Sequence, residues 1–216
     1  YFILHAPRQT GKTTLMLQIM EQLNREGNYI ALYVNIEAGQ AYRNDTKEVN
    51  LTIIREFQRK TMIYLPEEYQ PSAKALAHTG EFSDFLTRWC LELPKPLVVF
   101  MDEIDTLIGD SLLSVLRQIR AGYTTRPKAF PHAMALIGLR DIRDYRIYSE
   151  SGQRYEIGGS AFNIKEQSLL LENFTLEQVR ELYQQHTDET GQAFSPEALE
   201  MIFWYTRGQP WLVNAL

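Results

Sequence analysis

The segment Ala6–Thr14 (APRQTGKTT) gathers a lysine, hydroxyl side chains and a glycine into one short loop. Gly11 has no side chain, so it lets the backbone come close to a ligand. Backbone N–H groups in such a loop, and at the start of a helix that follows it, favour an anion. Lys12 would reach the outer phosphates of a nucleotide, and the Thr13 hydroxyl would bind Mg²⁺. We therefore expect this loop to hold phosphate groups.

The loop matches the phosphate-binding pattern A-x-x-x-x-G-K-T, with Ala6 where glycine is usual. The apolar run Tyr1–His5 before it is typical of a strand, and Lys12–Arg25 after it has the apolar spacing of a helix. A chance match to the pattern would not be expected to lie between a strand and a helix, as this one does. The predicted nucleotide-binding residues in the loop are Ala6, Pro7, Arg8, Gln9, Thr10, Gly11, Lys12, Thr13 and Thr14.

A second candidate lies at Leu97–Glu103 (LVVFMDE), an apolar strand that ends in two carboxylates. Asp102 would hold Mg²⁺ through water, and Glu103 would orient the water that attacks a phosphate. An acidic pair at a strand end is also common on ordinary protein surfaces. The upstream phosphate loop favours the catalytic interpretation, with Asp105 as a helix cap or a supporting group.

A glutamate directly after this aspartate resembles the AAA+ proteins and the STAND NTPases, including the bacterial and archaeal AAA-like ATP-binding proteins. No N-K-x-D guanine-binding motif is found, so ATP is expected rather than GTP. The resemblance implies ATP and Mg²⁺ as ligands. It also implies a parallel five-stranded sheet of order 5-1-4-3-2, sandwiched by helices, with a small C-terminal helical lid.

Two later segments resemble further parts of this family. Ala135–Asp141 (ALIGLRD) is similar to the arginine-containing sensor 1 of STAND proteins, which implies that Arg140 senses the γ-phosphate. Arg143 and Arg146 are alternatives, including as arginine fingers for a neighbouring subunit. All three arginines could instead pair with nearby aspartates on a solvated loop.

Thr206–Val213 (TRGQPWLV) resembles the G-x-P motif of STAND lids. There the proline, here Pro210, packs near the adenine and the turn couples the lid to the nucleotide. Arg207 is a weaker candidate for a lid sensor. A purely local interpretation is that Gly208 ends one helix and Pro210 starts the next; both can hold together.

The elements that must position these residues form an α/β pattern. Strands alternate with helices through about residue 172, which predicts a parallel sheet covered on both faces. Only helices follow, with a capping box at Thr175–Gln178. We therefore expect a P-loop core at residues 1–172 and a helical lid at 173–216. The predicted strands are Tyr1–His5, Tyr29–Ile36, Leu97–Met101, Ala133–Gly138 and Ser168–Leu171. A loop or an irregular insertion is predicted at Leu65–Gly80, and a loop at Arg143–Ser160.

Composition narrows the classes of protein. The chain has 216 residues and a net charge of −5, which argues against a wholly basic nucleic-acid binder. Cys90 is the one cysteine, so no disulfide can form within the chain, and a reducing, cytoplasmic setting is favoured. No apolar run reaches the roughly 20 residues that span a bilayer, so no membrane is expected. The chain starts without Met and ends in an apolar helix-like run, so we expect it to be an excised, truncated piece that lacks flanking domains.

Three functions remain open. The first is slow, Mg²⁺-dependent ATP hydrolysis that serves as a regulatory or assembly switch, with ATP/ADP exchange controlling a protein effector or a nucleotide-dependent homo-oligomer. The second is a DNA-associated AAA+ motor or loader. A basic strip could serve it, but a solvated helix face explains the same residues: Arg117, Arg120, Arg126 and Lys128. The third is a module that binds nucleotide without turnover.

Overall fold

The computed structural model describes residues 1–77, 81–141, 147–148, 154–155 and 167–216. Contacts within the chain divide it into two compact units. The sheet unit comprises Tyr1–His5 and Thr13–Leu169, and the helical unit comprises Ala6–Lys12 and Leu170–Leu216. The phosphate loop predicted from the sequence thus groups with the C-terminal helices.

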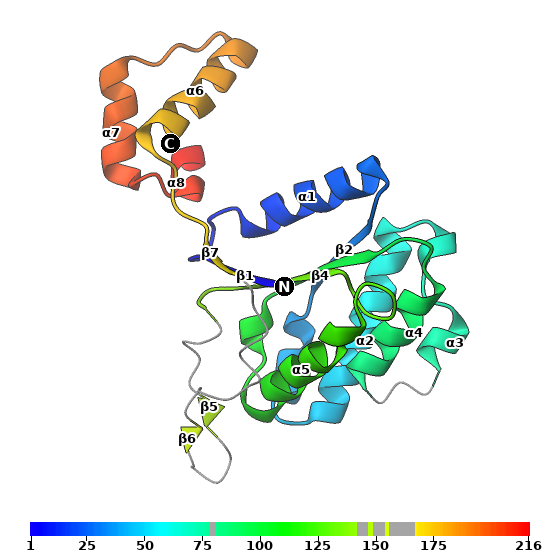
Figure 1. Cartoon of the computed structure of the whole chain (residues 1–216). Helices are drawn as coiled ribbons and strands as arrows, with labels where there is room; N and C mark the ends of the chain where they lie inside the picture. Colours follow the sequence, from blue (N-terminus) through cyan, green and yellow to red (C-terminus); the bar gives the residue numbers. More distant parts are fainter. Residues whose placement is uncertain (78–80, 142–146, 149–153, 156–166) are drawn as a thin grey trace. The chain divides into compact units, whose positions relative to one another are not determined.

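A five-stranded sheet in the order β2-β3-β4-β1-β7 is the centre of the sheet unit (Figure 1). The β2/β3, β3/β4 and β4/β1 pairs are parallel, as expected for strands joined by helical crossovers. Counted along the chain the order is 2-3-4-1-5, which confirms the predicted α/β fold and the order 5-1-4-3-2. The strands are β1 (Phe2–His5), β2 (Ile30–Asn35), β3 (Leu97–Asp102), β4 (Ala133–Gly138) and β7 (Gln167–Leu170).

The register of strand pairing brings the carboxyl ends of the strands level with one another. Asn35 at the end of β2 pairs with Asp102 at the end of β3, and His5 at the end of β1 pairs with Gly138 at the end of β4. These ends therefore share one edge of the sheet, where ligands bind in open parallel sheets.

Helices cover both faces of the sheet. In Figure 1, α1 lies on one side and α2, α4 and α5 lie on the other. Asp45 caps α2 by accepting a hydrogen bond from the Glu48 backbone N–H, and Pro94 and Pro96 follow the end of α4. The helices are α1 (Lys12–Glu26), α2 (Thr46–Tyr64), α3 (Ala73–Leu76), α4 (Phe82–Glu92) and α5 (Gly109–Gly122).

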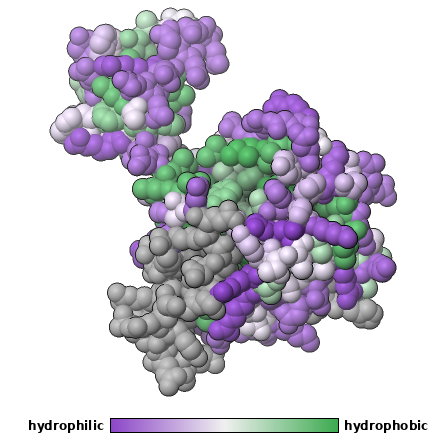
Figure 2. Space-filling model, in the orientation of Figure 1, coloured by the Kyte–Doolittle hydropathy of each residue, from purple (hydrophilic) through white to green (hydrophobic). Residues whose placement is uncertain are grey.

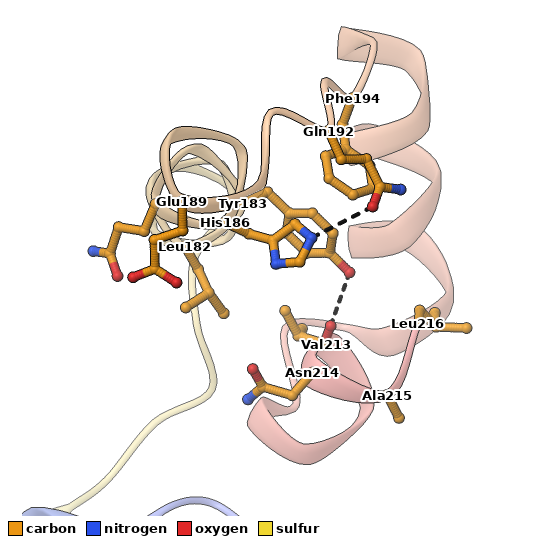
Figure 3. A pocket seen from close by; sticks show the side chains of 11 residues that line it. Leu182, Tyr183, His186, Glu189, Gln192, Phe194, Val213, Asn214, Ala215 and Leu216 are labelled. Atoms are coloured by element: carbon orange, nitrogen blue, oxygen red, sulfur yellow. Dashed lines mark hydrogen bonds between the residues drawn. The ribbon is translucent and has the colours of Figure 1, made fainter.

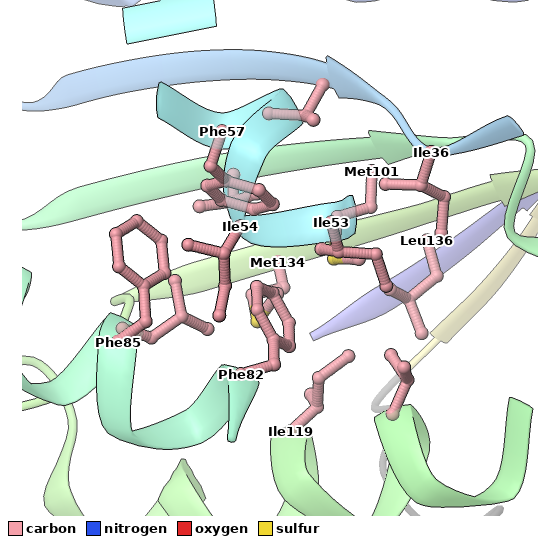
Figure 4. Close-up of a cluster of buried hydrophobic side chains, with 14 of the residues drawn as sticks. Ile36, Ile53, Ile54, Phe57, Phe82, Phe85, Met101, Ile119, Met134 and Leu136 are labelled. Carbon is pink, nitrogen blue, oxygen red and sulfur yellow. The ribbon is translucent and has the colours of Figure 1, made fainter. Parts of the chain in front are cut away.

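The core lies between the sheet and α2, α4 and α5 (Figure 4). Val99, Met101 and Leu136 point toward these helices, because alternate residues of a strand share one face. Phe57 is fully buried, with its ring centroid 5.2 Å from that of Phe82 and 6.4 Å from that of Trp89. This aromatic cluster fixes α2 against α4.

The opposite face of the sheet packs on α1. Met16 and Met20 of α1 are buried, and the Met20 sulfur accepts a hydrogen bond from the Tyr33 backbone N–H at 3.2 Å. Asn24 binds the backbone N–H and the carbonyl of Ala31 with its side-chain amide. These contacts hold α1 along β2.

The helical unit contains α6 (Leu176–Thr190), α7 (Pro196–Thr206) and α8 (Pro210–Ala215). Thr175 and Gln178 form the predicted capping box, and Ser195 caps α7 with proline as its first residue. Val179, Tyr183 and Val213 form a small apolar core. On the face shown in Figure 2, hydrophilic residues cover most of this unit.

Two segments predicted as loops contain regular structure. Leu65–Gly80 includes α3, because the Ser72 hydroxyl accepts hydrogen bonds from the backbone N–H groups of Lys74 and Ala75 and so starts a helix. Within Arg143–Ser160, the pair β5 (Ile147–Tyr148) and β6 (Arg154–Tyr155) is antiparallel, and the remaining residues lie outside the described ones. Among the helices of the described residues, none has the length and the apolar character needed to cross a membrane.

Phe57→Ala tests the aromatic cluster. The substitution removes a fully buried ring, so we expect the free energy of unfolding to fall by about 3–5 kcal/mol in urea denaturation. Ile63→Ala, on the same helix but with 61% of the residue exposed, is the control and should change this value by less than about 0.5 kcal/mol. Equal effects of the two substitutions would contradict the described core.

Candidate functional site

The loop Ala6–Lys12 connects β1 to α1 and is shaped by its own side chains. The Lys12 ammonium donates to the carbonyls of Ala6 and Pro7, both at 2.8 Å, and the Thr10 hydroxyl donates to the Pro7 carbonyl at 2.9 Å. Gln9 and Gly11 have φ values of 62° and 84°. A side chain at Gly11 would meet no atom within 4 Å, so glycine is favoured there by the left-handed backbone and not by lack of space.

Exposure differs among the loop residues that the sequence singled out. Ala6, Thr10 and Lys12 are buried, and the others are exposed: Pro7, Arg8, Gln9, Gly11, Thr13 and Thr14. The buried members all take part in the hydrogen bonds within the loop.

Asp102 is a buried carboxylate with three hydrogen-bond donors. It is 2% exposed. Its Oδ2 accepts hydrogen bonds from the Thr13 hydroxyl at 2.9 Å and the Tyr33 hydroxyl at 2.6 Å, and its Oδ1 accepts one from the Glu103 backbone N–H at 2.9 Å. These donors offset the cost of burying the carboxylate.

Thr13 and Asp102 suit Mg²⁺ chemically. Both offer hard oxygen ligands, and they are adjacent, since the Thr13 hydroxyl donates to Oδ2 of Asp102 at 2.9 Å. Among the residues described, no group of three or more His, Cys, Asp and Glu side chains could hold a metal. This donor set fits Mg²⁺, which keeps waters and takes substrate phosphates as further ligands.

Glu103 has a left-handed backbone, with φ 59° and ψ 38°. Its N–H binds the Asp102 side chain, and its carbonyl accepts hydrogen bonds from the backbone N–H and the hydroxyl of Thr106. Residues other than glycine rarely adopt this conformation unless surrounding contacts impose it. The chain therefore turns at the half-buried Glu103, directly after β3.

Asp105 joins this turn to the end of β4. Its Oδ2 accepts a hydrogen bond from the Leu139 backbone N–H at 3.2 Å, and its Oδ1 is buried without a hydrogen bond among the described residues. Arg140 follows and is exposed, and the buried Asp141 accepts a hydrogen bond from the Ser168 hydroxyl at 2.6 Å. The supporting role expected for Asp105 is consistent with these contacts.

The turn between α7 and α8 is held by backbone contacts. The Phe174 N–H donates to the Gly208 carbonyl at 2.8 Å, and a Cβ at Gly208 would lie 1.9 Å from the Phe174 carbonyl oxygen. Glycine is therefore required there. Pro210 is buried at the start of α8, and the Arg207 guanidinium lies 5.1 Å from the centre of the Trp204 ring.

The structure groups the predicted site residues in two sets. Loop residues 6–12 and Pro210 belong to the helical unit, and Thr13, Thr14, Asp102, Glu103 and Arg140 belong to the sheet unit. Arg143 and Arg146 lie outside the described residues.

Sequence reasoning missed Tyr33 and Gln209. Tyr33 pairs with Phe100, two residues before Asp102, so both side chains lie on one face of the sheet. The pairing register decides this contact and leaves no signal in the sequence. Gln209 was visible as the middle residue of the G-x-P turn, but nothing local indicated its partner.

A separate cavity of about 440 Å³ lies within the helical unit (Figure 3). The Tyr183 hydroxyl donates to the Val213 carbonyl at its edge, and His186 approaches Gln192 at 3.4 Å. None of the site residues predicted from the sequence lines it, so it is distinct from the phosphate loop.

A comparison with known protein families finds a match that covers almost the whole chain. The family described as an AAA-like domain matches residues 2–216. No curated protein matches the sequence significantly.

Three similar solved structures share the fold. A Walker-type ATPase of Pyrococcus abyssi has a TM-score of 0.60 at 17% identity, covering 98% of this chain and 60% of that one. Cdc6p of Pyrobaculum aerophilum has a TM-score of 0.56 at 17% identity, covering 94% and 48%. AMPPCP-bound DnaA of Aquifex aeolicus has a TM-score of 0.57 at 10% identity, covering 99% and 52%. The chain spans about half the length of these proteins.

Tyr33→Phe tests the support of Asp102. The variant keeps the ring but removes a donor to a buried carboxylate, so the free energy of unfolding at pH 7 should fall by about 1–3 kcal/mol in urea denaturation. Tyr29→Phe is the control, because the Tyr29 hydroxyl makes no hydrogen bond within the described part of the chain.

The stability of Tyr33→Phe relative to wild type should also depend on pH. Burial, and next the hydrogen bond to Asp102, raise the pKa of Tyr33 above its ordinary value. The folded state thus holds this proton more tightly, so the stabilisation is complete below about pH 10 and declines above it. The stability difference between wild type and Tyr33→Phe should therefore stay constant from about pH 8 to about pH 10 and shrink above it, and a difference that does not shrink by about pH 11.5 would argue against the contact.

Proposed function

Because the chain belongs to the AAA-like domain family, we propose that it is an ATPase that converts ATP and water to ADP and phosphate with Mg²⁺. We propose further that slow turnover serves a regulatory or assembly switch. The observation that carries the proposal is the buried Asp102 carboxylate, which accepts a hydrogen bond from the hydroxyl of Thr13, the residue directly after the loop lysine.

In this proposal the loop binds the phosphates of ATP. The backbone N–H groups of the loop, except at Pro7, and those at the start of α1 would donate to the phosphate oxygens. Lys12 either turns from the carbonyls of Ala6 and Pro7 toward the β- and γ-phosphates, or contacts the carbonyls and the phosphates at the same time. Thr13 would hold Mg²⁺ directly and Asp102 would hold it through water, and the ion would neutralise phosphate charge.

Hydrolysis needs an oriented water. The water oxygen forms a bond to the γ-phosphorus, the bond from that phosphorus to the bridging β–γ oxygen breaks, and the water proton passes to Glu103 or to a phosphate oxygen. Glu103 orients the water from its left-handed position directly after β3. Lys12 stabilises the charge that develops on the phosphate oxygens.

Arg140 and Pro210 complete the proposed site. The exposed Arg140, directly after the end of β4, senses the γ-phosphate, and the turn at Pro210 packs near the adenine. The functional division is a core at residues 1–172 and a lid at 173–216. A protein effector or a further domain would read the switch.

The net charge of the chain and the contacts of Arg126 favour a switch over a DNA motor. The net charge is −5. The Arg126 guanidinium lies 3.5 Å from the centre of the Tyr123 ring and donates to the Tyr123 and His132 carbonyls. Its commitment to these internal contacts weakens the basic strip that a DNA site would need.

Nucleotide binding and turnover by variants test the proposal. Wild type should bind ATP with Mg²⁺ and hydrolyse it more slowly than about ten turnovers per second. Lys12→Ala should lose binding, because the phosphate charge then lacks its cation. Glu103→Gln should bind ATP but lose turnover by about a hundredfold or more.

Lys47→Ala and Glu67→Gln, both exposed and outside the loop, are matched controls and should behave as wild type. Binding without hydrolysis in wild type, with no effect of Glu103→Gln, would identify a binding module. Strong stimulation by DNA would instead favour the motor.

A further inference from the structure

Four successive carbonyls of the phosphate loop accept side-chain hydrogen bonds. Lys12 donates to the first two, those of Ala6 and Pro7. The Gln209 side-chain amide donates to the next two, at 3.5 Å for Arg8 and 3.1 Å for Gln9. The outer side of the loop is therefore held by one residue at its own end and by one residue 200 positions away.

These contacts with the loop carbonyls also set the direction of the loop N–H groups. In a trans peptide the C=O and the following N–H point in opposite directions. A donor bound to the Gln9 carbonyl therefore directs the Thr10 N–H the other way, and the weaker contact at Arg8 does the same for the Gln9 N–H. Backbone N–H groups so directed are the groups that bind phosphate oxygens in such loops.

The other end of the Gln209 amide starts α8. Its Oε1 accepts a hydrogen bond from the Leu212 backbone N–H at 2.7 Å, so the side chain caps the helix. The turn behind it is fixed by the Gly208 contact with Phe174 and by a hydrogen bond from the Gln209 N–H to the Thr206 carbonyl. One amide thus binds both the phosphate loop and the helix of the lid.

We propose that Gln209 is a positioning residue that orients the phosphate loop for anion binding and links the occupancy of the loop to the order of α8. The inference rests on the proposed function only for the identity of the anion, the phosphate chain of ATP or ADP. Linkage is reciprocal, so nucleotide binding must stabilise α8 as far as α8 stabilises the loop.

The chemistry explains why the residue is glutamine. A primary amide is both donor and acceptor at one end of a flexible side chain. Glutamate could cap α8 but would place a carboxylate against carbonyl oxygens. Serine is a good helix cap but is too short to reach the loop. These differences separate the capping role from the loop contact.

The test compares Gln209→Ser and Gln209→Glu with wild type. Gln184→Ser is the matched control, because Gln184 is exposed on α6 and, within the described part of the chain, hydrogen-bonds with its side chain to Asp188 alone. The first readout is hydrogen exchange of backbone amides in the nucleotide-free protein. The second is the dissociation constant for ADP and for ATP with Mg²⁺, and the third is the protection of α8 amides on adding nucleotide.

Both Gln209 variants should exchange the amides of Gln9 and Thr10 about three- to tenfold faster than wild type and bind nucleotide weaker by a similar factor, as expected for the loss of one hydrogen bond. Nucleotide should protect α8 in wild type and in Gln184→Ser but not in Gln209→Ser. Faster loop exchange with α8 still ordered in Gln209→Glu would separate positioning from unfolding of the lid.

Unchanged loop exchange in both Gln209 variants would overturn the inference, whether or not nucleotide binds. If wild type binds no nucleotide, the proposed function fails, but the exchange rates of the free protein still decide whether Gln209 holds the loop. If binding is normal in Gln209→Ser and α8 protection is retained, the link between loop and lid is wrong.

Discussion

A buried carboxylate at the end of a central strand constrains the sheet unit. Removing a carboxylate from water costs several kcal/mol unless hydrogen bonds replace the lost hydration. Asp102 obtains its donors from three places: Tyr33 on the neighbouring strand, Thr13 at the start of α1, and the backbone N–H of Glu103. The pairing of β2 with β3 and the docking of α1 must both be correct for this carboxylate to be tolerated.

The same carboxylate relates stability to the proposed chemistry. Its Oδ2 is shared by Tyr33 and Thr13, so the tyrosine hydroxyl restrains the group that would face Mg²⁺. Such outer hydrogen bonds set the orientation and basicity of metal ligands. The left-handed Glu103 follows directly, held by Asp102 on one side and Thr106 on the other. The residues proposed to bind metal and to orient water are thus fixed by one continuous set of contacts.

In the helical unit, the loop and the turn before α8 depend on each other. Lys12 satisfies one part of the loop backbone and Gln209 another. Gly208 permits the close approach of Phe174 that no other residue would allow. The G-x-P segment, which resembles a nucleotide-contacting turn, thereby acquires a second contact through its middle residue.

Local patterns were sufficient for the fold and for the candidate residues on the loop and on β3. Alternating apolar strands and amphipathic helices predicted the α/β architecture, because their periodicity is set by backbone geometry within each element. The strand order came from the family resemblance and agrees with the structure. The helix starts at Thr175 and Ser195 were also readable, since capping is a contact between residues three apart.

Tertiary structure decided the contacts between distant segments. The hydroxyl of Tyr33 meets Asp102 only because the strands pair in one register, and a shift by one residue would turn it to the other face. The grouping of loop residues 6–12 with Leu170–Leu216, and the contact of Gln209 with Gln9, join positions about 200 residues apart. The sequence by itself indicated the residues that we propose to bind phosphate and metal, because residue type and local spacing set that chemistry. Which neighbours hold those residues in place depended on long-range packing, which has no local signature.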